Sequence, residues 1–173
     1  MLSDTLKRIY WFLGLWLVQV TLFDHIALLG YAIPMPYVYF FCFLPTNTQR
    51  WIYVATGFAL GLLIDFFTGT PGVGAASCCA VGLATPYLLK LFAPSGYAFD
   101  EPFVPSVRTM EWLPFLRFVL SLSFLNCLIY FMIEAFTLKT FGRLFVMAIS
   151  STLITTLIIS AVEYLRKDTR RSR

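Results

Sequence analysis

The chain has 173 residues, of which 59% are hydrophobic and 13% are charged, and its net charge is +4. A soluble domain carries about 25% charged residues, so much of this apolar surface must face something other than water. The apolar residues form long blocks separated by short polar breaks, which is typical of bilayer-spanning helices and not of the alternating strands of a β-barrel. The composition predicts an all-α polytopic membrane protein and does not indicate nucleic-acid binding.

The first apolar run follows Lys7 and Arg8 and lacks a small-x-small cleavage site, so we expect an uncleaved anchor. The second span has to accommodate Pro34 and Pro36, and the pattern does not define where it begins. The third and fourth spans are joined by the short turn TGTPG and must be antiparallel neighbours. Six spans in one domain are predicted, at about 9–23, 30–45, 51–68, 73–92, 112–135 and 141–165, with a cytoplasmic loop at 93–111 and a basic tail at 166–173.

The loop at 93–111 contains Pro94, Pro102 and Pro105, so we expect extended chain that contacts cytoplasmic partners. Basic residues favour the cytoplasmic side, and both termini there would leave only Lys139 and Arg143 outside. The cytoplasmic set would be Lys7, Arg8, Arg50, Lys90, Arg108, Arg117, Arg166, Lys167, Arg170, Arg171 and Arg173. Four aromatic residues would then lie near the inner interface, namely Trp11, Trp51, Trp112 and Tyr164.

One carboxylate, Asp65, lies in an otherwise apolar run. Gly57, Gly61, Asp65 and Gly69 recur at intervals of four residues, so they share one helix face. A stripe of small residues marks close approach of another helix, and a membrane carboxylate is expected to face protein rather than lipid. Pro71 and Gly72 follow the stripe in the TGTPG turn. We therefore predict a packing or partner site formed by Gly57, Gly61, Asp65, Gly69, Pro71 and Gly72.

The fourth span offers two matching surfaces, Ala76, Ala80, Ala84 and Gly74, Cys78, Gly82. Packing alone explains such spacing, with a ligand cavity as the alternative. For Asp65, the simplest interpretation is a carboxylate satisfied by backbone amides of the TGTPG turn or by an interhelical cation. Leucine at this position is expected to be damaging and asparagine much milder.

Other polar residues give weaker indications. Glu134, Lys139 and Arg143 are predicted to form an outer charge cluster that orients the bundle or receives a partner helix. Arg117 is expected to reach the inner headgroups, and the pair Asp24 and His25 is read as a polar break at the membrane surface. The cysteines have no CxxC spacing, so neither a disulfide framework nor a zinc site is expected; they are Cys42, Cys78, Cys79 and Cys127.

Several short strings, in this order, resemble the bacterial rod shape-determining protein family MreD. They are Gly61-Leu62-Leu63 with Asp65, Thr70-Pro71-Gly72, Ala75-Ala76, Pro86-Tyr87, PSVRTM at 105–110 and EAF at 134–136. Members often carry histidine where this chain has Gly74, Asn126 and Cys127, so no histidine role is assigned.

The resemblance implies a non-enzymatic scaffold of the bacterial inner membrane. It implies direct binding of MreC and cooperation with MreB, RodA and its transpeptidase partner in side-wall peptidoglycan synthesis. It also implies a fold like the substrate-binding subunits of energy-coupling-factor transporters. No cofactor comes with the family, and a homodimer within a complex is compatible with it.

Two alternatives belong to other classes. A small-molecule-binding subunit of an energy-coupling-factor-type transporter needs several polar groups around one cavity, for which Asn126, Glu134 and Asp65 are the candidates. A membrane-embedded enzyme acting on lipid needs paired acids, and Asp65 with Glu134 is the candidate pair. The chain otherwise shows no nucleophile, base and orienting group at a usable spacing, so docking is the favoured function.

Overall fold

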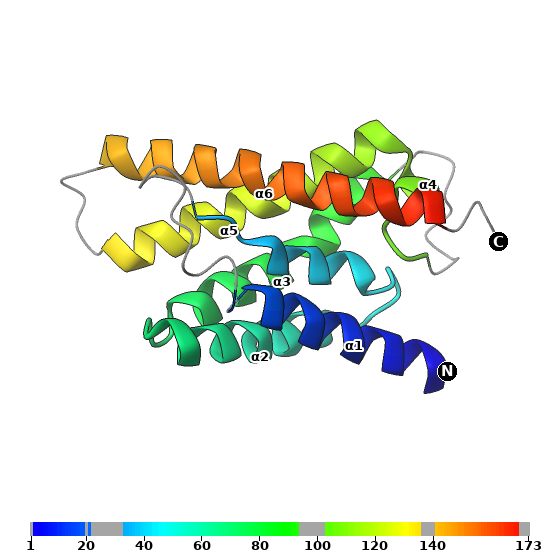
Figure 1. The fold of residues 1–173 in the computed structure, drawn as a ribbon, viewed down its shortest axis with the longest axis horizontal. Coiled ribbons are helices and arrows are strands. Elements are labelled where there is room, and N and C mark those ends of the chain that lie inside the picture. Colours follow the sequence, from blue (N-terminus) through cyan, green and yellow to red (C-terminus); the bar gives the residue numbers. More distant parts are fainter. Residues whose placement is uncertain (1, 20, 22–32, 94–102, 136–140, 170–173) are drawn as a thin grey trace.

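The computed structural model describes residues 2–19, 21, 33–93, 103–135 and 141–169, and within these ranges every regular element is helical (Figure 1). Four helices are long and apolar enough to cross a membrane by length and composition, namely Arg50–Thr68, Val73–Phe92, Trp112–Ala135 and Gly142–Arg166. The described part of the chain therefore has the architecture of an α-helical membrane protein. The elements are α1 (Leu2–Val18), η2 (Pro36–Phe43), α2 (Arg50–Thr68), α3 (Val73–Phe92), α4 (Val107–Met110), α5 (Trp112–Ala135) and α6 (Phe141–Thr169).

The four long helices pack in the order α2, α3, α5, α6, because α3 contacts both α2 and α5, and α5 contacts α6. Figure 1 shows the α2–α3 turn, the end of α5 and the start of α6 at one end of the bundle, which we call the turn end. The start of α1, the end of α6 and α4 lie at the opposite end, which we call the α4 end. Helices α2, α3 and α5 lie within one residue of the predicted ranges 51–68, 73–92 and 112–135. Helix α6 runs on to Thr169, so its last turn takes in the start of the predicted basic tail.

Helix α1 begins earlier than the predicted 9–23 span and ends at Val18. Its 17 residues correspond to about 26 Å, somewhat less than the roughly 30 Å of a bilayer's hydrocarbon core. The helix lies against η2 through aromatic pairs: Trp11 stacks on Phe43 with ring centroids 4.8 Å apart, and Phe12 meets Phe40 edge-on at 5.1 Å. Trp11 is thus partly buried against η2, and its predicted level near the inner interface stays a prediction.

Residues 33–45, predicted as part of a spanning α-helix, instead form the eight-residue 3-10 helix η2 between extended ends. All residues from Pro34 to Leu44 are buried, and η2 contacts α1, α3, α5 and α6. Pro34 and Pro36 have no N–H and cannot continue an α-helix through this region. Irregular backbone at membrane depth is tolerated where protein surrounds it, and η2 meets that condition.

Candidate functional site

Asp65 lies in the last turn of α2 and is only 5% exposed. Its Oδ1 accepts the Gly74 N–H at 2.7 Å and the Thr70 hydroxyl at 3.2 Å. Its Oδ2 accepts the Gly72 N–H at 3.0 Å and the Ala75 N–H at 2.9 Å. Both carboxylate oxygens are therefore fully engaged by the turn and by the first residues of α3.

This arrangement caps α3 from outside that helix. The first amides of any helix lack intrahelical partners, and the N-cap residue Gly72 has no side chain to accept them. Asp65 supplies the missing acceptor and places negative charge at the positive end of the α3 dipole. We call Asp65 with the amides of Gly72, Gly74 and Ala75 the carboxylate lock. The prediction that turn amides satisfy Asp65 is confirmed.

Below the lock, α2 and α3 touch through their backbones. A Cβ atom added at Gly61 would lie 2.6 Å from Ala75 Cα, and one at Gly57 would lie 2.6 Å from the Cys78 carbonyl oxygen. From α3, a Cβ at Gly82 would lie 2.5 Å from the Tyr53 carbonyl oxygen. Real Cβ atoms do not approach so closely. We call Gly57, Gly61, Gly74 and Gly82 the glycine seam, and only glycine fits there without a shift of the helices.

The predicted stripe divides into two parts. Gly57 and Gly61 lie in the seam, whereas Gly69 and Gly72 lie in the turn, with φ of +70° and +89°. Such left-handed conformations favour glycine. Pro71 is exposed between them. Of the two candidate surfaces on α3, the one that meets α2 contains Gly74, Cys78 and Gly82, while Ala76 is exposed.

A second polar constellation holds the chain that leads into η2. The hydroxyls of Ser151 and Thr155, one turn apart on α6, accept the N–H groups of Ile33 at 3.0 Å and Met35 at 2.9 Å. The alternate residues Pro34 and Pro36 have no N–H to satisfy. Of the four residues from 33 to 36, two therefore have an N–H group bonded to a hydroxyl, and the other two are prolines without an N–H group. Sequence reasoning missed this role, although the string SSTLITT at 150–156 was its visible signal.

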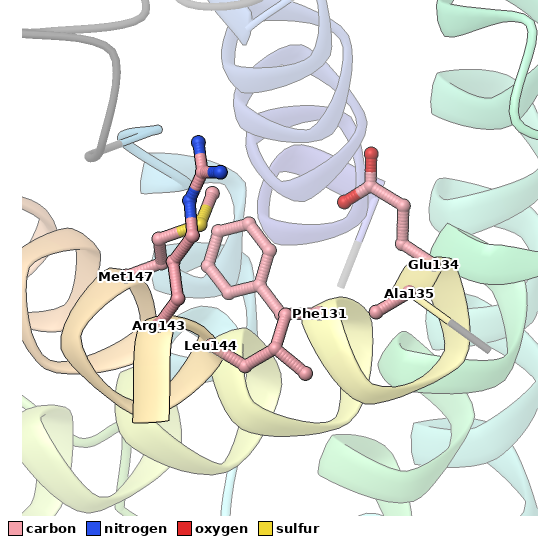
Figure 2. Close-up of a pocket in the computed structure, with 6 residues that line it drawn as sticks. All are labelled: Phe131, Glu134, Ala135, Arg143, Leu144 and Met147. Atoms are coloured by element: carbon pink, nitrogen blue, oxygen red, sulfur yellow. The ribbon is translucent and has the colours of Figure 1, made fainter. Parts of the chain in front are cut away.

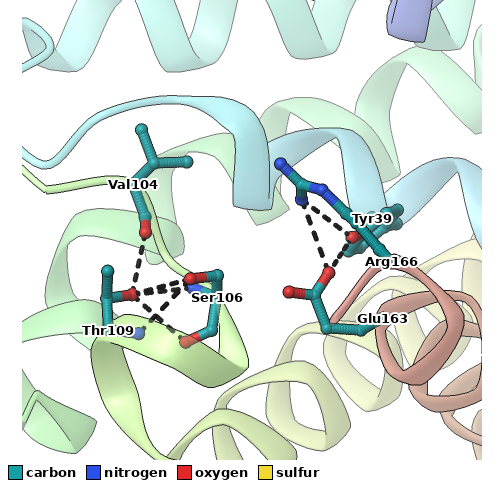
Figure 3. A network of polar contacts seen from close by, with 6 residues as sticks. All are labelled: Tyr39, Val104, Ser106, Thr109, Glu163 and Arg166. Atoms are coloured by element: carbon teal, nitrogen blue, oxygen red, sulfur yellow. Dashed lines mark hydrogen bonds and ion pairs between the residues drawn. The ribbon is translucent and has the colours of Figure 1, made fainter. Parts of the chain in front are cut away.

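The far end of η2 is held by a buried triad. The Tyr39 hydroxyl donates to Glu163 of α6, and Arg166 Nη1 lies 3.3 Å from the Tyr39 oxygen and 3.4 Å from Glu163 Oε2 (Figure 3). The Arg166 guanidinium also lies over the Phe43 ring, 5.0 Å from its centroid. The carboxylate of Glu163, 4% exposed and within one turn of the end of the α6 span, thus has a donor and a cation. Glu163 had not been singled out from the sequence.

Asn126 belongs to the core of the bundle. Its Nδ2 donates to the Tyr37 hydroxyl at 2.9 Å and lies 3.2 Å from Met35 Sδ. Asn126, Tyr37 and Met35 are all buried, and Asp65 makes its contacts in the α2–α3 turn. The structure therefore gives Asn126 and Asp65 separate internal partners and does not assemble them into one ligand site.

The predicted outer charge cluster is described in part, because Lys139 lies outside the described residues. Glu134 and Arg143 line a groove of about 320 Å³ at the turn end, together with Phe131, Ala135, Leu144 and Met147 (Figure 2). Figure 2 shows the two charged side chains rising on either side of the Phe131 ring. Glu134 comes from the last turn of α5 and Arg143 from the first turn of α6, so the helix pairing brings them to one opening.

The described end of the 93–111 loop differs from the predicted extended chain. Val107–Met110 forms the one-turn helix α4, and a reciprocal capping box joins Ser106 and Thr109. The Thr109 hydroxyl also donates to the Val104 carbonyl at 2.9 Å (Figure 3). Phe103, Val107 and Met110 are buried in the core. This part of the loop is therefore packed against the core at the α4 end. The Ser-x-x-Thr spacing was the local sequence signal for its capping box.

Asp24 and His25 lie outside the described residues. Among the residues that the structure does describe, no group of three His, Cys, Asp or Glu side chains is arranged to hold a metal ion. Four membrane-length apolar helices, close backbone packing and internally bonded polar residues define the class, that of α-helical membrane proteins. No protein-family model, curated protein or solved structure matches the chain. Any narrower assignment rests on the short strings that resemble MreD.

Proposed function

We propose that the chain is a non-enzymatic scaffold of the rod elongation complex in the bacterial inner membrane, with MreC as its direct partner. Its six spans place both termini in the cytoplasm and the turn end outside. It works with MreB, RodA and the associated transpeptidase to control cell shape and side-wall peptidoglycan synthesis. The alternative is a small-molecule-binding subunit of an energy-coupling-factor-type transporter.

The observation that carries the proposal is the carboxylate lock. The strings that resemble MreD at 61–65, 70–72 and 75–76 supply Asp65 with two of its three amide donors, and Gly61 of the glycine seam. A surface made by two tightly fixed helices presents a constant shape to a partner, at little entropic cost of ordering on binding. This supports docking as the function.

A second observation favours docking over ligand transport. The segment 34–44 fills the space between α1, α3, α5 and α6 with buried side chains, five of which are aromatic. Apolar side chains instead project outward from α2, where Trp51, Phe58, Leu62 and Phe66 are exposed. Such a face contacts lipid or the apolar helix of a partner.

Site-specific photocrosslinking in native membranes tests the proposal. A photoreactive residue at Phe66, which is 81% exposed next to the lock, should capture MreC. The same residue at Leu157, 69% exposed on α6, is the matched control and should capture MreC far less. Recovery of an ATPase pair with a transmembrane coupling subunit, and no MreC from either position, would support the transporter alternative.

The orientation has its own test. A reporter fused after Arg173 should behave as cytoplasmic, because eleven of the thirteen basic residues then lie on that side. Activity of a periplasmic reporter at this position would reverse the orientation and place the lock at the inner surface.

A further inference from the structure

We propose that the groove at the turn end binds the headgroup of a phosphatidylethanolamine molecule from the surrounding bilayer. We name it the headgroup groove, formed by Phe131, Glu134, Ala135, Arg143, Leu144 and Met147. The inference concerns lipid recognition and is independent of which protein partner the scaffold binds.

The position of the groove along the helices is the first argument. The candidate membrane span of α5 ends at Ala135, and that of α6 begins at Gly142. Glu134 and Arg143 therefore lie within one turn of the ends of two adjacent spans, the level at which a bilayer presents its headgroups. A groove at this level is bathed in phospholipid at high local concentration.

The charges provide the second argument. Phosphoethanolamine carries a phosphate anion and an ammonium cation only a few bonds apart. Arg143 offers a guanidinium for the phosphate, with planar N–H donors that match its oxygens. Glu134 offers a carboxylate for the ammonium. Both side chains rise on the same side of α5 with the Phe131 ring between them, so one zwitterion bridges them above an apolar floor (Figure 2).

The floor supplies the third argument. Phe131 is 1% exposed, and Leu144 and Met147 are half-buried beside it. The exposed side chains of Phe145, Val146 and Ile149 continue the apolar surface of α6 away from the groove. A headgroup between the two charges can therefore lay its acyl chains along apolar protein surface, as a phospholipid requires.

The choice of ethanolamine follows from hydrogen bonding. An ammonium group has three N–H donors for the Glu134 carboxylate, whereas the quaternary ammonium of choline has none. A glycerol headgroup keeps the phosphate for Arg143 but brings no cation to Glu134. The expected order of affinity is phosphatidylethanolamine first, with phosphatidylcholine and phosphatidylglycerol both weaker.

Native mass spectrometry of the full chain, released from micelles with each of these three lipids carrying identical acyl chains, measures this order directly. We expect phosphatidylethanolamine to bind about tenfold more tightly than the other two, a difference of about 1.4 kcal/mol. Glu134→Gln should remove this preference and leave phosphatidylglycerol binding unchanged. Arg143→Gln should weaken all three lipids. Arg117→Gln, which removes an exposed cation at the other end of α5, is the matched control and should leave the preference for phosphatidylethanolamine unchanged.

Thermal melting of each variant in lipid-free micelles shows whether it is folded. Two results would overturn the inference: equal binding of all three lipids by the unmodified chain, or a preference for phosphatidylethanolamine that survives Glu134→Gln in a folded variant. The exchanged variant Glu134→Arg/Arg143→Glu offers the same two charges in reverse order. It should recover part of the preference that Glu134→Gln loses, which a general effect of net charge would not produce.

Discussion

In the α2–α3 hairpin, two regular helices approach until their backbones touch, and one carboxylate satisfies the amides left over at the turn. In the η2 region, the backbone is irregular, and its amides depend on hydroxyls from a distant helix or are removed by proline. The hairpin excludes side chains from its seam, whereas η2 is packed by large aromatic ones. The two regions show two ways to keep backbone polar groups satisfied inside a bilayer: regular helices bond their own N–H and C=O groups, and irregular backbone is surrounded by protein that supplies partners.

The largest expected effect is at the lock, where Asp65→Leu removes the acceptor of three amides. At roughly 1–3 kcal/mol for each of the three orphaned amides, we expect a loss of about 3–9 kcal/mol in the free energy of unfolding. Denaturant titration in mixed micelles, followed by circular dichroism, measures it. The sequence-based expectation that asparagine would be much milder is revised, because both oxygens are used and the new NH₂ group would face N–H donors. Asp65→Asn should therefore lower the free energy of unfolding by nearly as much as Asp65→Leu.

The matched control for Asp65 is Thr70→Val, which removes a single 3.2 Å contact to the carboxylate and leaves the amides bonded. The Thr70→Val variant should lose only about 1 kcal/mol in the free energy of unfolding. An asparagine variant as stable as the unmodified chain would contradict the capping role and leave the seam as the source of the hairpin's stability.

The second prediction tests the α6 hydroxyls that accept the backbone amides of the chain leading into η2. The double variant Ser151→Ala/Thr155→Ala leaves the amides of Ile33 and Met35 without acceptors, and we expect a loss of about 2–4 kcal/mol. Amide hydrogen exchange should rise at Ile33 and Met35 and stay unchanged in α2 and α3. Thr56→Ala in α2 is the control, because the Thr56 hydroxyl bonds carbonyls of its own helix, and it should change stability by less than about 0.5 kcal/mol. Equal effects of the two variants would show that η2 does not depend on these hydroxyls.

The third prediction tests the close packing of the two regular helices α2 and α3. Gly61→Ala drives a methyl group into the α3 backbone, 2.6 Å from Ala75 Cα, and should cost about 1–3 kcal/mol. Gly14→Ala in α1 meets no atom within 4 Å, so the better helix propensity of alanine should stabilise that variant by about 0.5–1 kcal/mol. A lower melting temperature for Gly61→Ala and a higher one for Gly14→Ala would show that the loss at Gly61 comes from packing and not from helix propensity. A neutral Gly61→Ala would mean that α2 and α3 can move apart without loss.

The smallest effect is expected at the triad. Tyr39→Phe keeps the ring and removes one hydroxyl, while the contact between Arg166 and Glu163 at 3.4 Å persists, so the loss should be about 1 kcal/mol. Tyr164→Phe, on an exposed α6 position, is the matched control and should be neutral. A loss above about 3 kcal/mol would indicate that Glu163 depends on Tyr39 far more than on Arg166.

The same contrast explains what the sequence could predict. The boundaries of α2, α3 and α5 follow from local information, since each is an apolar block limited by polar or turn residues. The lock was also within reach, because Asp65 and its donors lie within ten residues of each other. The η2 region was not, because its partners Ser151 and Thr155 lie 118 and 120 residues away, and a hydroxyl-rich string does not indicate which distant amides it will accept. A run of aromatic residues interrupted by prolines looks the same whether it forms a broken helix or a buried 3-10 segment.

The distance between η2 and α6 also fixes an order of events during synthesis. The α2–α3 hairpin needs no residue beyond position 82 for its lock and seam, so it is complete once its own two helices have emerged. The η2 segment precedes that hairpin in the chain but meets Ser151, Thr155 and Glu163 only after α6 has been made. A chain truncated before α6 would leave the amides of Ile33 and Met35 without these acceptors in a lipid environment. Helix α6 therefore completes the packing of a segment that was translated more than a hundred residues earlier, and the hairpin between them in the sequence is finished first.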